Sequence, residues 1–147
     1  MQQTEKQQTY LMIKPEILAD ERQAVGEILA AVGRAGFRFL ELKTWRLDRP
    51  LAESFYAEHR GKEFFPPLMD YITSGPVLAV RLEGPDAVRR LRELVGATNP
   101  AAAACGTIRS LYGRSLTQNA VHASATVEDA QRELQIVFGR PGGGGDA

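Results

Sequence analysis

The succession of strand-like and helix-like patterns is the feature that most constrains how this chain can fold. Four segments carry the apolar runs or the apolar–polar alternation typical of strands, at residues 10–13, 37–47, 77–82 and 119–122. The few helical patterns between them could not cover both faces of a parallel sheet. We therefore predict an α+β sandwich of the split-βαβ kind, with a mainly antiparallel four-stranded sheet and helices on one side. A doubly wound parallel sheet is the alternative.

Helical patterns separate these strands, at residues 25–32, 51–73, 85–95 and 127–137. The first pattern ends before Gly36, where a helix C-terminus favours glycine. The third opens at Pro85, which would occupy the first helical position, and Thr126 predicts the N-cap of the last helix. The strand pattern slips at Phe39-Leu40, which predicts a β-bulge.

Composition indicates one soluble domain. The chain has 147 residues, 44% of them hydrophobic, and its 18 basic and 18 acidic residues balance, which argues against a nucleic-acid or membrane-surface partner. No apolar run is long enough to span a membrane, the N-terminus lacks a secretory apolar stretch, and the single Cys105 fits a reducing cytosol. We expect a cytoplasmic protein with a folded domain at 9–138, a flexible N-terminus at 1–8 and a flexible glycine-rich tail at 139–147.

Residues 96–118 show no convincing periodicity, and loops of this length in small domains are usually functional or disordered. Disorder fits poorly, because the segment contains four side chains that favour burial, namely Ile108, Leu111, Tyr112 and Leu116. No acidic residue occurs between Glu93 and Glu128, where an average composition would place about four. Donors and cations without carboxylates suit a phosphate-bearing anion. A solvated, alanine-rich loop that happens to lack acids is the alternative.

His122 is the candidate nucleophile. It ends a short apolar stretch and precedes a helix, a typical place for a functional side chain, although a lone histidine beside apolar residues is more often structural. Glu133 lies on the flank of that helix's apolar face, so its carboxylate could turn toward the imidazole and fix its tautomer. His59 lies among charged residues and is expected to be a surface side chain. The chain has no Walker loop, GxGxxG sequence or protein-kinase motif.

Several motifs, in order and at matching spacing, make residues 9–138 resemble the nucleoside diphosphate kinase family. They are TYLMIKPE at 9–16, FYAEHRGKEFFPPLMDYITSGPVLAVRLEGPDAV at 55–88, GATNP at 96–100, GTIR at 106–109 and NAVHAS at 119–124. The resemblance implies a ferredoxin-like sandwich. It also implies ping-pong transfer of the γ-phosphate from a nucleoside triphosphate to a nucleoside diphosphate through a phosphohistidine.

The resemblance implies a role for each matching residue. His122 would accept the phosphate with support from Ser124 and Glu133, and Lys14 would contact the ribose hydroxyls and the attacked phosphate. The other contacts would be Asn119 with the ribose, Phe64 and Leu116 with the base, Tyr56 near the histidine, and Arg92, Thr98 and Arg109 with the β- and γ-phosphates. Mg²⁺ would bridge the phosphates without a protein cage. A base held by stacking would be weakly discriminated, and a homo-oligomer, a dimer-based tetramer or hexamer, is implied as well.

The chain departs from the family's usual pattern in several places. Residues 122–125 read HASA where His-Gly-Ser-Asp is common, and residues 109–112 read RSLY where Arg-Gly-Asp-Phe is usual. Two alternatives follow. The first is a family member that binds nucleotide with little or no turnover. The second is a ferredoxin-like nucleic-acid binder that stacks bases on Phe64 and Phe65, against which the balanced charge argues.

Overall fold

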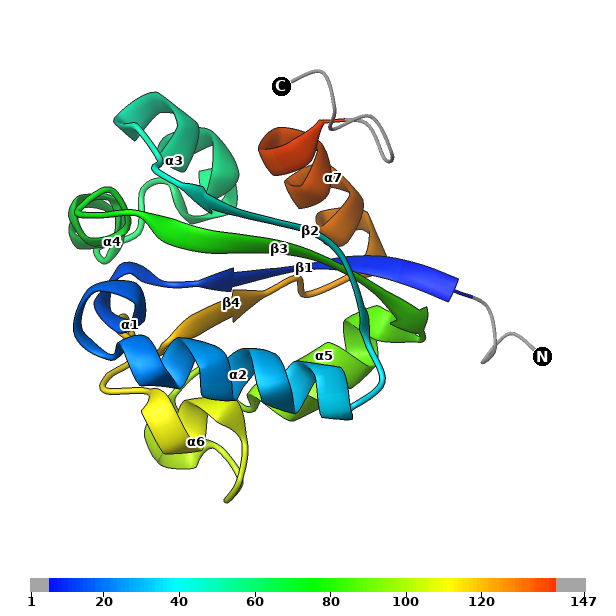
Figure 1. Ribbon diagram of the computed structural model, residues 1–147. Helices are drawn as coiled ribbons and strands as arrows, with labels where there is room; N and C mark the ends of the chain where they lie inside the picture. Colours follow the sequence, from blue (N-terminus) through cyan, green and yellow to red (C-terminus); the bar gives the residue numbers. More distant parts are fainter. Residues whose placement is uncertain (1–5, 140–147) are drawn as a thin grey trace.

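The computed structural model describes residues 6–139 (Figure 1). One sheet contains β1 (Lys6–Ile13), β2 (Arg38–Trp45), β3 (Val77–Pro85) and β4 (Val121–Ala123), in the order β2-β3-β1-β4. Every pair of neighbouring strands is antiparallel. This topology confirms the predicted α+β sandwich and excludes the parallel alternative. The flexible ends expected at residues 1–5 and 140–147 lie outside the described residues.

Helices cover both faces of the sheet, so the prediction that they would lie on one side is wrong (Figure 1). One face is covered by α1 (Pro15–Asp20), α2 (Arg22–Arg34), α5 (Ala87–Val95) and α6 (Ile108–Tyr112). The other is covered by α3 (Arg49–Phe55), α4 (Phe65–Ile72) and α7 (Val127–Phe138).

The central strand β1 explains why both faces need a cover. Leu11 and Ile13 pack in the core beneath α2 and α5, whereas Tyr10 and Met12 pack beneath α3, α4 and α7, and all four side chains are fully buried. Side chains alternate along a strand, so a continuous apolar run buries both of its faces. The register sets Met12 opposite His122, which places His122 on the face covered by α3, α4 and α7.

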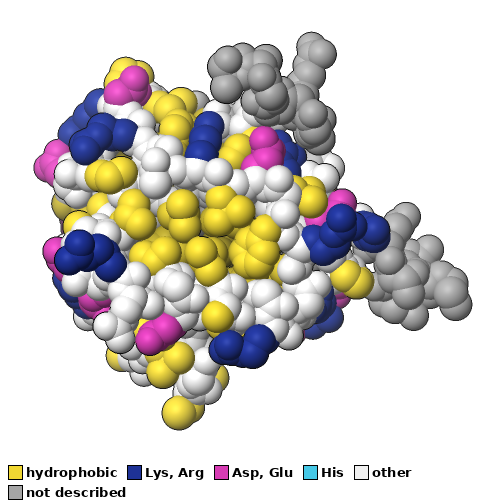
Figure 2. Space-filling model, viewed as in Figure 1, with side chains coloured by type: hydrophobic (Ala, Val, Ile, Leu, Met, Phe, Trp, Pro, Cys, Tyr) yellow, Lys and Arg dark blue, Asp and Glu magenta, His cyan; other side chains and the backbone are white. Residues whose placement is uncertain are grey.

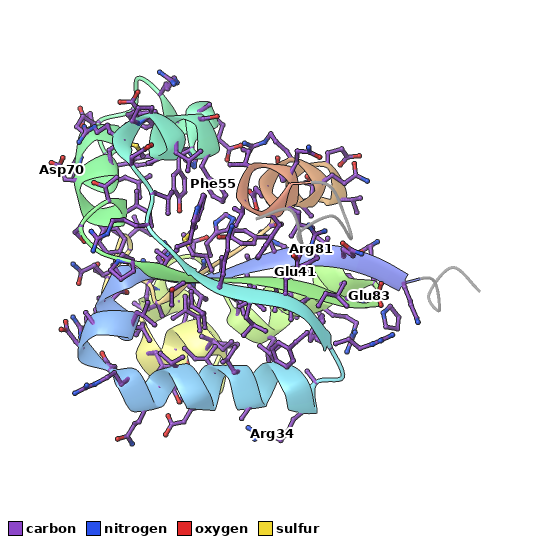
Figure 3. The ribbon with its side chains drawn as sticks, turned by 45° about the horizontal axis from the view of Figure 1, so that its top comes forward. Arg34, Glu41, Phe55, Asp70, Arg81 and Glu83 are labelled. Atoms are coloured by element: carbon purple, nitrogen blue, oxygen red, sulfur yellow. The ribbon has the colours of Figure 1, made fainter. Side chains whose placement is uncertain are left out.

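Several element boundaries differ from those predicted. β1 begins at Lys6, within the expected flexible N-terminus, because residues 6–8 pair with residues 83–85 of β3. Pro85 ends β3 instead of opening α5, which begins after Asp86 in a left-handed conformation. The predicted bulge is confirmed as a register shift between Phe39 and Glu41. Figure 3 shows Glu41 close to the buried Arg81, whose Nε donates to its carboxylate at 2.6 Å.

The segment at residues 96–118 is shaped by close local contacts. It contains a single 3-10 turn, η3 (Pro100–Ala102), and the short helix α6, neither of which was predicted. Gly96 has φ 94° and lies against Thr107, and Gly113 lies against Pro100. A Cβ added at either glycine would be 2.5 Å from the facing side chain, so the segment folds back on itself only with glycine at these two positions.

The burial expected within this segment is only partly found. Ile108 is buried and Tyr112 is half-buried, but Leu111 and Leu116 are 62% and 61% exposed, so the prediction for these two leucines is wrong.

Within residues 6–139, no helix is both long enough and apolar enough to cross a membrane.

Candidate active site

A cavity of about 370 Å³ is lined by residues that follow β1 and α3, by residues of α5 and β4, and by part of the segment at 96–118. It brings together nine of the eleven predicted site residues: Lys14, Tyr56, Phe64, Arg92, Thr98, Arg109, Leu116, Asn119 and His122. The other two, Ser124 and Glu133, are buried behind His122. No acidic residue lines the cavity, which fits the acid-free stretch of sequence around it.

His122 is held by a buried carboxylate. Its Nε2 lies 2.8 Å from Oε1 of Glu133, and the same oxygen accepts a hydrogen bond of 2.7 Å from the hydroxyl of Ser124. Thr126 caps α7, as predicted, by accepting from the N–H of Asp129. The cap fixes where α7 begins, and therefore where Glu133 projects toward β4.

The protonation of Glu133 decides which imidazole nitrogen is free. Burial alone would raise the pKa of the Glu133 carboxyl, but the His122 ring and the Ser124 hydroxyl outweigh this and leave that pKa below its ordinary value. An ionised carboxylate can only accept hydrogen bonds, so Nε2 of His122 carries the ring proton. In the neutral imidazole the lone pair therefore lies on Nδ1, which has no hydrogen-bond partner among residues 6–139.

Aromatic rings surround the imidazole. The His122 ring lies 5.2 Å from Phe55, 6.1 Å from Tyr56 and 5.9 Å from Tyr10, measured between ring centroids. Figure 3 shows Phe55 extending from α3 toward the sheet. The hydroxyls of Tyr10 and Tyr56 are buried without a hydrogen-bond partner in the described part of the chain, and burial raises both of their pKa values. The ring is thus held by packing as well as by Glu133.

Lys14 connects three distant segments. Its side chain is buried, and its Nζ donates to Oδ1 of Asn119 at 2.7 Å. The amide nitrogen of Asn119 donates in turn to the carbonyl of Thr98 at 2.9 Å. Burial and the nearby Arg109 lower the pKa of Lys14 to about 7, against an opposing effect of Glu16. The side chain is therefore poised to gain a proton when an anion approaches.

Arg109 is fixed at the cavity wall. Its Nη1 donates to the carbonyl of Gly96 at 3.0 Å and its Nη2 to the carbonyl of Val121 at 2.9 Å. Burial and the neighbouring Arg92 lower the pKa of Arg109 to about 10, so the guanidinium stays charged at neutral pH. Arg92 and Thr98 are more exposed and line the same cavity. Cations gathered without carboxylates make an anion-binding site.

Part of the cavity lining is formed by exposed apolar side chains. Phe64 and Leu116 both line the cavity and are 46% and 61% exposed. His59 lines it too, with its ring 5.2 Å from Phe64 and 6.4 Å from Tyr56, so this partly exposed side chain is also part of the cavity wall. Sequence reasoning missed this position because charged residues surround His59 in the sequence. Its spacing, three residues after Tyr56 and five before Phe64, was the available signal.

The departure from the family pattern beside His122 is accommodated. Ala123 lies in β4 opposite Leu11, and its backbone φ is not positive, so this position does not require glycine. Ala125 lines the cavity where the family commonly has an acidic side chain. Ala125 adds no negative charge to the lining, and His122 keeps its contact with Glu133.

The cavity side chains that the structure describes do not form a protein-held metal site. Residues 6–139 contain no group of three or more His, Cys, Asp or Glu side chains that could hold one. The cavity offers cations and hydroxyls, so a divalent ion would have to enter with the phosphates of a ligand, bound through phosphate and water oxygens.

The fold and the site together define an α+β protein with a cationic, anion-binding cavity beside a histidine that a buried carboxylate holds, an arrangement suited to phosphotransfer. A sequence model of the family described as nucleoside diphosphate kinase matches residues 7–141. The chain belongs to the nucleoside diphosphate kinase family, whose members are nucleotide phosphotransferases.

Individual relatives agree with this assignment. The nucleoside diphosphate kinase of Thermus thermophilus is 50% identical over 132 residues, which cover 90% of this chain and 95% of that protein. That of Archaeoglobus fulgidus is 46% identical, covering 90% and 86%. Among solved structures, the Aquifex aeolicus nucleoside diphosphate kinase has a TM-score of 0.87 at 37% identity, covering 91% and 96%. A halophilic nucleoside diphosphate kinase from Halobacterium salinarum, in complex with CDP, has a TM-score of 0.86 at 40% identity, covering 92% and 90%.

Proposed function

We propose that this chain transfers the γ-phosphate of a nucleoside triphosphate to a nucleoside diphosphate through a phosphohistidine at His122. The observation that carries the proposal is the 2.8 Å contact between Nε2 of His122 and Glu133, which leaves Nδ1 as the nucleophilic nitrogen in a cavity without acidic residues.

The reaction has two half-reactions. In the first, the Nδ1 lone pair of His122 attacks the γ-phosphorus, an N–P bond forms, and the bond from that phosphorus to the bridging oxygen breaks, releasing the nucleoside diphosphate. The phosphorylated ring is cationic, and the Glu133 carboxylate stabilises it through the Nε2 proton. In the second, a terminal oxygen of another nucleoside diphosphate attacks the same phosphorus, a P–O bond forms, and the N–P bond breaks with its electron pair returning to Nδ1, which restores the neutral imidazole.

The site residues divide into four groups in this proposal, according to whether they contact the phosphates, the ribose, the base or the imidazole. Phosphate oxygens are bound by Lys14, Arg92, Thr98 and Arg109, which neutralise charge and align the phosphorus with Nδ1. Asn119, held by Lys14 and Thr98, contacts the ribose. The base stacks between Phe64 and Leu116, while Tyr56 packs beside the imidazole and Ser124 and Glu133 orient it.

The substrates follow from this division. A base held by an aromatic ring and an aliphatic side chain is weakly discriminated, since every base has a π face. We therefore propose nucleoside di- and triphosphates of any base as substrates. The Halobacterium salinarum relative is in complex with CDP, which supports a nucleotide as the ligand of this chain.

We propose Mg²⁺ as the cofactor. When bound, it supplies charge neutralisation on the β- and γ-phosphates, which complements Arg92 and Arg109. The absence of carboxylates from the cavity lining supports an ion held by the nucleotide.

Incubation with γ-labelled ATP tests the proposal. The protein should retain acid-labile, alkali-stable label, and His122→Ala should retain none. His59→Ala is the matched control, because it removes the other cavity histidine and should still accept label. Label on His122→Ala would refute the assignment. Nucleotide binding without label on the unaltered protein would favour the alternative of a family member with little turnover.

We also propose that the chain forms a homo-oligomer through β2. This strand is at the edge of the sheet, and Phe39, Leu40 and Leu42 on it are 38%, 37% and 47% exposed. Figure 2 shows hydrophobic side chains gathered across the centre of this face. An unpaired edge with apolar side chains favours pairing with a second copy, which supports a dimer-based assembly.

A cytoplasmic location is proposed too, since the exposed Cys105 suits a reducing compartment.

A further inference from the structure

Glu16 is a buried acidic residue that the reaction described above does not use. It lies in the first turn of α1 and is 6% exposed. One carboxyl oxygen accepts a hydrogen bond from the hydroxyl of Tyr71 on α4, and the other accepts from the backbone N–H of Ala120 at 3.0 Å. Glu16 does not line the cavity. Its two partners instead fix it against the turn that precedes β4.

Ala120 has a strained backbone. Its φ is 78°, and the only other non-glycine residue of the described range with a positive φ is Asp86, at 50°. The N–H of Val121 donates to the carbonyl of Asn119 at 3.0 Å and closes a three-residue turn around Ala120. A γ-turn with positive φ is rare for a residue that has a Cβ. Such strain persists only where the surrounding structure imposes it.

The segment at residues 14–16 imposes it here. The N–H of Ala120 is bound by Glu16, and the carbonyl of Ala120 accepts from the backbone N–H of Lys14 at 2.9 Å. Asn119 is the first residue of this turn and His122 directly follows its last residue, and the side chains of Asn119 and His122 both line the cavity. Rotation of the Ala120 backbone would therefore move the ribose contact and the nucleophile relative to each other.

We propose that Glu16 is a positioning residue for phosphotransfer. Its carboxyl group holds the strained turn at Ala120, so that the side chains of Asn119 and His122 keep their positions relative to each other in the cavity. The inference rests on the proposed role of His122. Glu16 acts through the backbone of the turn and touches neither the nucleotide nor the phosphorus.

Two near-isosteric substitutions separate this role from simple packing. Glu16→Gln keeps an oxygen for the Ala120 N–H and can donate from its amide nitrogen to the Tyr71 hydroxyl, so kcat should stay within roughly threefold of the unaltered protein. Glu16→Met fills the same space without an acceptor and should lower kcat about tenfold or more, because a buried N–H loses its partner. Glu27→Ala is the control, since it removes an exposed glutamate–tyrosine hydrogen bond, with Tyr112, and should leave kcat unchanged.

The deciding comparison repeats Glu16→Met in an Ala120→Gly background. Glycine adopts a positive φ without a Cβ clash, so the loss caused by Glu16→Met should shrink to about threefold or less there. Equal losses with and without the Ala120→Gly change, or no loss in either background, would overturn the proposal. If Glu16→Met does not fold, Tyr71→Phe, which frees one carboxyl oxygen, takes its place and is held to the same criterion.

Labelling of His122 keeps this proposal separable from the proposed function. An unaltered protein that takes no label from γ-labelled ATP refutes the phosphohistidine route. An unaltered protein that is labelled, together with a Glu16→Met variant labelled at the same rate, refutes only the role of Glu16.

Discussion

The lowered pKa of Lys14 predicts that nucleotide binding takes up a proton. Burial and Arg109 lower that pKa to about 7, so roughly nine-tenths of the free protein carries a neutral Lys14 at pH 8. Phosphates placed beside Nζ favour the ammonium and raise its pKa in the complex. The affinity for the nucleotide is therefore highest below pH 7, where Lys14 is already protonated, and it falls as pH rises through 7.

The magnitude follows from the same pKa. If the phosphates raise the Lys14 pKa by about two units or more, the coupling is worth about 3 kcal/mol, and the nucleotide Kd weakens by roughly 25-fold to 50-fold between about pH 7 and pH 9. At pH 8, binding should take up roughly 0.8 to 0.9 proton, since the terminal phosphate, with a pKa near 6, is already ionised.

Isothermal titration calorimetry with ADP checks this at pH 8, in two buffers with different ionisation enthalpies. The difference between the observed binding enthalpies gives the number of protons taken up. Lys14→Arg is the matched control, because a guanidinium keeps its proton at every pH used, so its uptake should be near zero. Uptake near zero in the unaltered protein, or equal uptake in Lys14→Arg, would contradict the low pKa as the cause.

Three other predictions concern separate parts of the molecule. Glu133→Gln should slow phosphorylation of His122 by about tenfold to a hundredfold in single-turnover experiments, because a neutral amide stabilises the cationic ring less than a carboxylate does; an unchanged rate would contradict its role. Phe64→Ala should weaken ADP binding by about 1–3 kcal/mol with little change in the single-turnover rate at saturation, and a loss confined to that rate would contradict a stacking role. Leu42→Lys should shift the chain to a smaller species in light scattering while the far-ultraviolet spectrum stays the same, and an unchanged mass would contradict association through β2.

The sequence predicted the sheet well because its strands are apolar in simple patterns. The continuous run at residues 10–13 and the slip at Phe39-Leu40 both correspond to observed features, a strand buried on both faces and a bulge. The helix α7 was predicted because Thr126 caps it and an apolar stripe follows. Short elements were missed for a physical reason: α6 has five residues, too few for a helical period to be visible.

The helix α1 was missed because the sequence shows no helical pattern between the predicted strand at residues 10–13 and the predicted helix at residues 25–32, a stretch in which Pro15 was not used as a helix signal. Proline is suited to the first position of a helix, which is the position it occupies here. The prediction of helices on one side failed because it rested on the small number of helical patterns alone. The continuous apolar run of β1 buries side chains on both faces of the sheet, so both faces need helices over them.

The site was partly predictable. Positions that match family motifs, such as His122 and Arg109, were named from sequence, and the cavity brings them together. Contacts that depend on tertiary structure could not be predicted. The hydrogen bond between Glu16 and Ala120 joins residues 104 positions apart, and the sequence around each of them carries no motif that indicates the contact. The positive φ of Ala120 gives no sequence signal, since glycine would be the expected residue there.

The central claim is that one nitrogen of one histidine carries the phosphate between nucleotides. Phosphorus NMR of the protein after reaction with ATP, combined with mass spectrometry of the peptide that contains residues 119–124, tests it most directly. The account predicts a single phosphoramidate at Nδ1 of His122 that disappears when a second nucleoside diphosphate is added. Phosphate on Nε2, on another residue, or persisting after that addition would contradict it.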